Sequence, residues 1–164
     1  MTSVFASPLS LRILGGRVFG RIGLVAALVV VAVLSWSPAR AADIPSDDDQ
    51  DVLVRSTLMT FNDANMTGNY SVMIAKSSKQ FQAQITPEKL GSSLEAFRTG
   101  KLFFEEIVTA DYDSQEKAKI DPDGALVLAG VLKGDLWQVK YNLRFVMNET
   151  AWKLLGFNVD CKHL

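Results

Sequence analysis

Residues 137–147 alternate between apolar and polar side chains, and this pattern constrains the fold more than any other part of the chain. The apolar members share one parity: Trp137, Val139, Tyr141, Leu143, Phe145 and Met147. The residues between them include Gln138, Lys140, Asn142 and Arg144. A period of two is typical of a β-strand with one buried face and one face in water. The sequence therefore predicts an antiparallel sheet that needs a covering layer on one side.

Successive hairpins are predicted around this strand. We expect strands at about 102–110, 117–120, 125–132, 136–147 and 151–160. The segment Asp121-Pro-Asp-Gly124 has proline and glycine where a type I turn favours them. Residues 133–135 and 148–150 have the composition of hairpin loops.

The last predicted strand differs from the others because its apolar residues fall on both parities. One parity carries Trp152 and Leu154, and the other carries Leu155, Phe157 and Val159. We therefore expect both faces of this strand to need cover.

Helices are predicted before the sheet. Ser46 and Asp49 have the spacing of a capping box, which begins a helix that extends to about Ala64. A short second helix is expected at 70–75. Thr86 with Pro87 caps a third helix that extends to Arg98 or Thr99. The order of helices followed by antiparallel strands predicts an α+β fold with three N-terminal helices.

The first 41 residues have the pattern of a secretory signal peptide. Arginines without acids precede the apolar run 22–36, and Ala39 and Ala41 supply small residues for cleavage between Ala41 and Ala42. The run has about 15 residues, fewer than the roughly 20 that span a bilayer as a helix. We expect a signal peptide at 1–41, a tether at 42–46 and one domain at 47–162. An uncleaved membrane anchor is the alternative.

The charge balance argues against nucleic-acid binding. All 18 acids follow residue 42, whereas only 13 of the 17 Lys and Arg residues do, so the mature part has a net charge of −5. Proteins that bind phosphate backbones need clustered Lys and Arg. We expect no nucleic-acid partner and, once the signal is removed, no stable membrane insertion. Cys161 is the only cysteine, so no intramolecular disulfide forms.

Groups that carry catalysis are scarce in this sequence. The only histidine is His163, the penultimate residue, where we expect a frayed end. One histidine and one cysteine do not make a metal site, so we expect no metal, no cofactor and no catalytic residues. Glu105 and Glu106 are adjacent on a predicted strand and would face opposite sides, which prevents a carboxylate pair.

Residues 132–157, with the closing segment Ala151-Trp-Lys-Leu-Leu-Gly156, resemble the final strands of the nuclear transport factor 2-like superfamily, of cystatin-like α+β cone architecture. The resemblance covers about residues 47–160 and is nearest to exported bacterial members, although the usual turn glycine is absent. It implies helices on a strongly curved antiparallel sheet of four to five strands, with a cone-shaped cavity. It also implies frequent homodimers through the outer sheet face and functions from isomerase and dehydratase to scaffold.

Two functions follow as expectations. The first is an exported, non-catalytic domain that binds a small apolar ligand between Trp137, Tyr141 and Phe145, or forms a homodimer through its last strand. Asp160 shares the parity of Trp152 and is expected at the mouth of that cavity. The alternative is a small isomerase or dehydratase that uses Tyr141 and Asp160. In both cases we expect a periplasmic or secreted protein.

Overall fold

The computed structural model describes residues 43–113 and 116–164, and these residues form an α+β fold. The signal peptide and the cleavage site at Ala41 and Ala42 lie outside the described residues. The helices are α1 (Asp47–Thr67), α2 (Ser71–Lys76), α3 (Lys79–Gln84), α4 (Pro87–Ser93), α5 (Glu95–Thr99) and the short 3-10 helix η1 (Glu105–Val108). The strands are β1 (Asp111–Asp113), β2 (Lys119–Ile120), β3 (Leu126–Lys133), β4 (Trp137–Asn148) and β5 (Ala151–His163).

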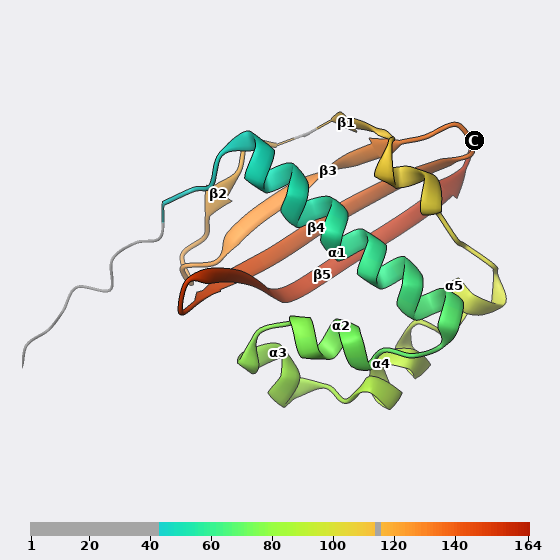
Figure 1. Ribbon diagram of the computed structural model, residues 1–164, viewed down its shortest axis with the longest axis horizontal. Coiled ribbons are helices and arrows are strands. Elements are labelled where there is room, and N and C mark those ends of the chain that lie inside the picture. Colours follow the sequence, from blue (N-terminus) through green and yellow to red (C-terminus); the bar gives the residue numbers. More distant parts are fainter. Residues whose placement is uncertain (1–42, 114–115) are drawn as a thin grey trace, which may run out of the picture. The chain divides into compact units, whose positions relative to one another are not determined.

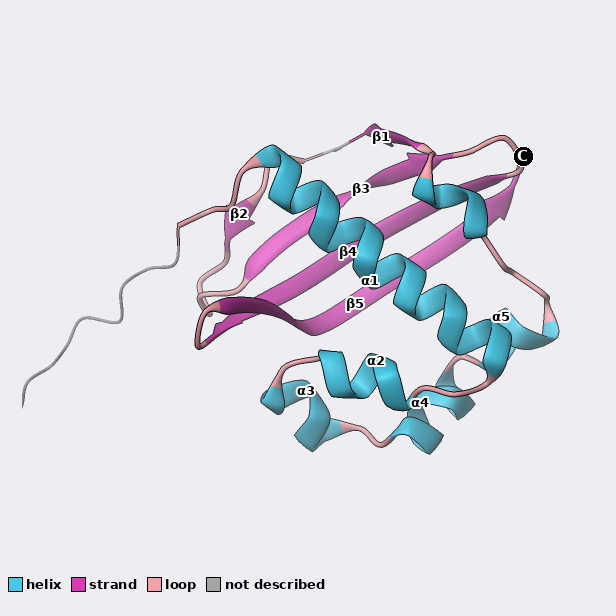
Figure 2. Cartoon of the chain, viewed as in Figure 1, coloured by secondary structure: helices cyan, strands magenta, loops and turns pink. Residues whose placement is uncertain are grey.

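The strands make one antiparallel sheet of five strands in the order β1-β3-β4-β5, with β2 also paired to β3. The predicted strands at 117–120, 125–132, 136–147 and 151–160 correspond to β2, β3, β4 and β5. Helix α1 runs diagonally across one face of this sheet, and α2, α3 and α4 lie beyond the edge formed by β5 (Figures 1 and 2). None of the helices in the described residues is long and apolar enough to cross a membrane.

The inner face of β4 is buried, as its alternation predicts. Val139, Tyr141, Leu143 and Phe145 are at most 2% exposed. They pair in register with alternate residues of β3 and lie under α1, whose buried stripe includes Val54, Leu58 and Phe61. The ends of the pattern are less covered, because Trp137 is half-buried and Met147 is 38% exposed.

Helix boundaries differ from the prediction after residue 77. Helix α1 begins as predicted, with the Ser46 side chain accepting a hydrogen bond from the Asp49 N–H. Helix α3 lies where the sequence pattern predicts no helix, and it is capped by the Ser78 side chain. The single helix predicted from Thr86 to Thr99 is wrong, because Leu94 leaves helical geometry and separates α4 from α5. The described residues therefore contain five α-helices where three are predicted.

The strand predicted at 102–110 is wrong. Phe104 and Ile107 are fully buried with helical spacing, and η1 forms there instead of a strand. The N–H of Phe104 finds a partner without a sheet, donating 2.8 Å to Oδ1 of buried Asn62. Because Glu105 and Glu106 lie on η1, the argument that they face opposite sides of a strand does not apply.

A β-bulge in β5 explains its two apolar parities. The register with β4 shifts between Arg144 and Phe145, whose partners are Gly156 and Leu154, so Leu155 is an extra residue. Before the bulge Leu154 lies opposite buried Phe145, and after it Phe157 lies opposite buried Leu143. Both apolar sets therefore face the same side of the sheet. The expectation that both faces of this strand need cover is therefore wrong. The sequence argument for a dimer through a doubly apolar strand no longer holds.

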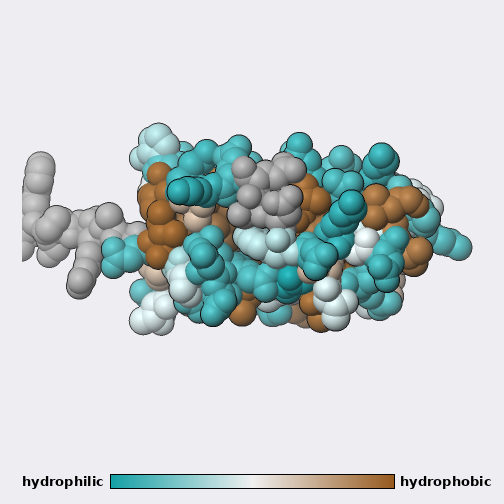
Figure 3. Space-filling model, turned by 90° about the horizontal axis from the view of Figure 1, so that it is seen from above, coloured by the Kyte–Doolittle hydropathy of each residue, from teal (hydrophilic) through white to brown (hydrophobic). Residues whose placement is uncertain are grey.

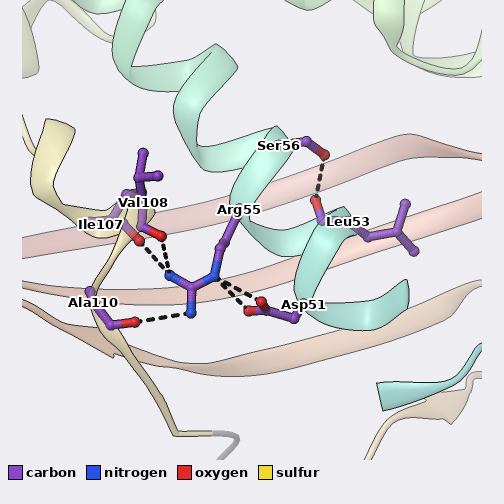
Figure 4. Close-up of polar contacts among 7 residues, drawn as sticks. All are labelled: Asp51, Leu53, Arg55, Ser56, Ile107, Val108 and Ala110. Carbon is purple, nitrogen blue, oxygen red and sulfur yellow. Dashed lines mark hydrogen bonds and ion pairs between the residues drawn. The ribbon is translucent and has the colours of Figure 1, made fainter. Parts of the chain in front are cut away.

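Arg55 ties α1 to the end of η1 and to the segment that follows it. Its Nε atom donates to both carboxylate oxygens of Asp51, at 2.8 and 2.9 Å. Its two terminal nitrogens donate to the carbonyl oxygens of Ile107, Val108 and Ala110, at 2.6, 3.1 and 2.9 Å (Figure 4). One guanidinium thus satisfies three backbone carbonyls that have no strand partner.

Replacing Arg55 with methionine is expected to lower the free energy of unfolding by about 2–3 kcal/mol, because three carbonyls lose a charged donor. Urea unfolding followed by circular dichroism measures this change. Lys89→Met on exposed helix α4 is the matched control and should change stability by less than about 0.5 kcal/mol. Equal effects of the two substitutions would show that Arg55 does not hold this segment.

Candidate functional site

The three aromatic residues predicted to line a cavity do not converge. Tyr141 and Phe145 are each only 2% exposed and fill the core, whereas Trp137 lies half-buried at the far end of β4. Trp137 and Phe145 are eight residues apart on one strand, a separation of about 26 Å. Trp137 contacts the ring of His163, which is the last residue of β5 and not a frayed end as predicted.

The hydroxyl of Tyr141 is buried and has no hydrogen-bond partner among the described residues. Burial raises the pKa of Tyr141 well above its ordinary value, and the neighbouring Tyr112 and Asp51 raise it further. The group is therefore a neutral phenol at physiological pH. It has no path to solvent, so it does not present a proton donor to an external ligand.

Asp160 lies on the opposite face of the sheet from Tyr141. The bulge at Leu155 reverses the parity of every later residue in β5, and Asp160 is exposed opposite Lys140 on the outer face. The prediction that places Asp160 at the mouth of an inner cavity is therefore wrong. Tyr141 and Asp160 are not brought together, and no acid–base pair forms from them.

Cys161 faces the core side of the sheet and is half-buried. Burial, with a smaller contribution from the Asp160 carboxylate, raises the pKa of its thiol to about 11. A thiol with such a pKa is almost entirely protonated near neutral pH and is a poor nucleophile or metal ligand. Within the part of the chain that the structure describes, no three His, Cys, Asp or Glu side chains cluster in a way that could hold a metal ion.

An open groove lies between α1, α2 and the first half of β5. We call it the α1–α2 groove, and its volume is about 190 Å³. It is lined by Leu53, Ser56, Thr57, Thr60, Met73, Lys76, Ser77, Phe145, Trp152, Lys153 and Leu154. Of the predicted pocket residues, only Phe145 reaches it. Figure 3 shows a different side of the domain, which is mainly hydrophilic with apolar patches separated by polar side chains.

Two hydrogen bonds hold the walls of the groove in place. The N–H of Ser78 donates 2.8 Å to the carbonyl of Leu154, which fixes the end of α2 against the edge of β5. The Ser77 hydroxyl donates 2.7 Å to the Met73 carbonyl and closes the last turn of α2. The groove between the two helices is open at the surface.

The floor and the walls of the α1–α2 groove differ in chemistry. Met73, Phe145, Trp152 and Leu154 give an apolar floor. Hydroxyl groups of α1 form one wall, and Thr60 Oγ1 accepts a 3.1 Å hydrogen bond from Lys76 Nζ. The arrangement suits a ligand with an apolar body and a polar end, but it contains no pair of groups that could act as general acid and base.

A second groove continues from the first. It shares Ser77 and Lys153 with the α1–α2 groove and has a volume of about 510 Å³. Its other lining residues are mostly polar: Ala75, Lys79, Gln80, Gln82, Asn148 and Glu149. The α1–α2 groove thus adjoins a wider groove at Ser77 and Lys153.

Among the residues that the structure describes, the lysines around these grooves form no ion pair with an acid. The ion pairs among the described residues join Arg55 to Asp51, Lys119 to Glu116, and Arg144 to Asp121 and Asp123. Lys76 and Lys153 take part in none of them. The sequence analysis misses both lysines, because nothing in their local pattern distinguishes them from solvated surface charges.

Comparisons with known proteins give no family for this chain. A scan against protein-family models, a search of curated proteins and a search of solved structures each find no match. The resemblance to the nuclear transport factor 2-like superfamily therefore stays a prediction.

Replacing Tyr141 with phenylalanine should leave stability at pH 7 unchanged or raise it by up to about 1 kcal/mol, because the lost hydroxyl has no partner. The raised pKa of Tyr141 stabilises the fold below the unfolded-state value near 10, and this stabilisation is lost as pH rises above it. The free energy of unfolding should therefore fall less steeply between pH 10 and 12 in Tyr141→Phe, by about 1.4 kcal/mol per pH unit.

Urea unfolding at pH 7 and at several values above pH 10 measures both effects. Tyr70→Phe is the comparison variant, because the buried Tyr70 hydroxyl donates 2.7 Å to Asn65 Oδ1 and its loss should lower stability at pH 7 by about 1 kcal/mol. A loss of more than about 1 kcal/mol at pH 7 in Tyr141→Phe would mean that the hydroxyl has a stabilising partner.

Proposed function

We propose that this protein is an exported, non-catalytic domain that binds a small, largely apolar ligand in the α1–α2 groove. The observation that carries the proposal is the open apolar floor of Met73, Phe145, Trp152 and Leu154 beside polar groups of two helices. Pockets that bind small molecules typically combine an apolar lining with a few polar groups that orient the ligand. Tyr141 is only 2% exposed and does not line this groove.

The size of the groove restricts the ligand. Its volume of about 190 Å³ lies below the roughly 300–1,000 Å³ of pockets for drug-sized molecules. A short hydrocarbon chain or a single ring fits this volume, and the wider second groove leaves room for a polar end. A fused-ring ligand such as a steroid does not fit the α1–α2 groove.

Export and the cone-shaped curvature belong to the same proposal. The pattern of residues 1–41 supports cleavage between Ala41 and Ala42 and a location in the periplasm or outside the cell. The order of helices followed by an antiparallel sheet agrees with what the resemblance implies. An isomerase that uses Tyr141 and Asp160 gains no support, since these residues lie on opposite faces of the sheet.

Titration of the isotope-labelled protein with 1-hexanol, followed by heteronuclear NMR, tests the proposal. We expect saturable shifts that are largest for amides of α1, α2 and the start of β5. Thr57→Phe fills the groove and should weaken binding at least fivefold. Val52→Phe is the matched control, because Val52 lies on the same helix but is 64% exposed and does not line the groove.

Shifts that do not saturate, or that are largest away from the groove, would contradict the proposal. So would equal affinity of the Thr57→Phe and Val52→Phe variants for 1-hexanol. Circular dichroism of both variants checks that the fold is intact before binding is compared.

A further inference from the structure

Every charged side chain that lines the α1–α2 groove is a lysine. Lys76 belongs to α2 and Lys153 to β5, so the two lysines come from different elements and approach the same groove. The part of the chain after residue 42 has a net charge of −5, with more acids than bases. The charged residues of the groove are therefore positive, whereas the rest of the domain is negatively charged on average.

Neither lysine is neutralised by a carboxylate of the described chain. Asp63 lines a depression next to Lys76, and Glu149 lines the second groove with Lys153. No ion pair within 4.0 Å joins either lysine to an acid among the described residues. Both ammonium groups thus remain available to a ligand anion. The attraction between the anion and the lysines would be strongest where the bound ligand excludes water from between them.

Lys76 is also held in position. Its Nζ atom donates 3.1 Å to Thr60 Oγ1, and the Thr60 hydroxyl donates 2.7 Å to the Ser56 carbonyl. A lysine that is already ordered loses less conformational entropy when it binds an anion. No arginine lines the groove, so the bidentate pairing that favours phosphate is not offered there.

We propose that the ligand of the α1–α2 groove is a carboxylate on a short hydrocarbon chain, an inference that rests on the proposed function. The chain lies on the floor of Met73, Phe145, Trp152 and Leu154, and the carboxylate accepts hydrogen bonds from the ammonium groups of Lys76 and Lys153. Anionic amphiphiles are then selected over neutral and cationic ones of the same length.

Three probes with one chain length test the inference on the full-length protein: hexanoate, 1-hexanol and hexylammonium. Calorimetry or NMR titration at low salt should show hexanoate binding at least fivefold more tightly than 1-hexanol, and hexylammonium more weakly than either. Raising the sodium chloride concentration should weaken binding of hexanoate but not of 1-hexanol.

Substitutions of the two lysines test whether they cause the preference for hexanoate. Lys76→Gln and Lys153→Gln should each weaken hexanoate binding about threefold or more and leave 1-hexanol binding unchanged. Lys140→Gln is the matched control, because Lys140 is exposed on the outer sheet face, away from the groove.

The outcomes separate the two proposals. Equal affinity for hexanoate and 1-hexanol, tighter binding of hexylammonium, or lysine variants that bind hexanoate normally would overturn the anion inference while ligand binding in the groove stands. Failure of all three probes to bind would overturn the proposed function and the inference together.

Discussion

The fold depends on the burial of one face of β4 beneath α1. Full burial of a Val, Leu or Phe side chain contributes about 1.5–3 kcal/mol, and Val139, Leu143 and Phe145 are all at most 2% exposed. The same contact fixes the register of β4 with its neighbours, because a slip of one residue would turn these side chains to solvent. Helix α1 is a single rod that crosses the sheet diagonally, so the rest of the sheet must be covered by other means. The α1–α2 groove lies beside the middle of α1, where α2 and the start of β5 form its other sides.

The chain between α5 and β1 has no strand partner, so side chains provide hydrogen bonds to its backbone groups. Asn62 accepts from the Phe104 N–H, and Arg55 donates to the carbonyls of Ile107 in η1 and of Ala110 after it. Glu106 Oε1 accepts from the N–H groups of Leu136 and Trp137 at 2.8 and 2.6 Å. The Phe104 N–H is buried, so it would be costly to leave without a partner. These bonds join residues 30 or more positions apart, so η1 is specified by the tertiary structure and not by its local pattern.

The features that could be predicted from the sequence are those whose cause is local. The alternation of 137–147, the Ser46 cap and the turn at Asp121 each depend on residues within a few positions, and the structure contains all three. Two kinds of feature could not be found in this way. The strand predicted at 102–110 has apolar residues at spacings that fit a strand or a helix. Burial of Ile107 beneath α1 favours the helical form, which is η1. The groove is assembled from four separate segments of the chain, so no single stretch shows a pattern for it.

The bulge at Leu155 connects the fold to the site. A single extra residue reverses the parity of β5, and this keeps Leu154 and Phe157 on the same side of the sheet although they are three positions apart. It also places Asp160 on the outer face, which removes the one acid that the sequence suggested for chemistry. Before the bulge, Trp152 and Leu154 form part of the floor of the groove, and the Leu154 carbonyl accepts the bond from Ser78 that holds α2 nearby. Trp152 and Leu154 lie before the bulge, so they keep their orientation toward the groove while Asp160 is turned to the opposite face.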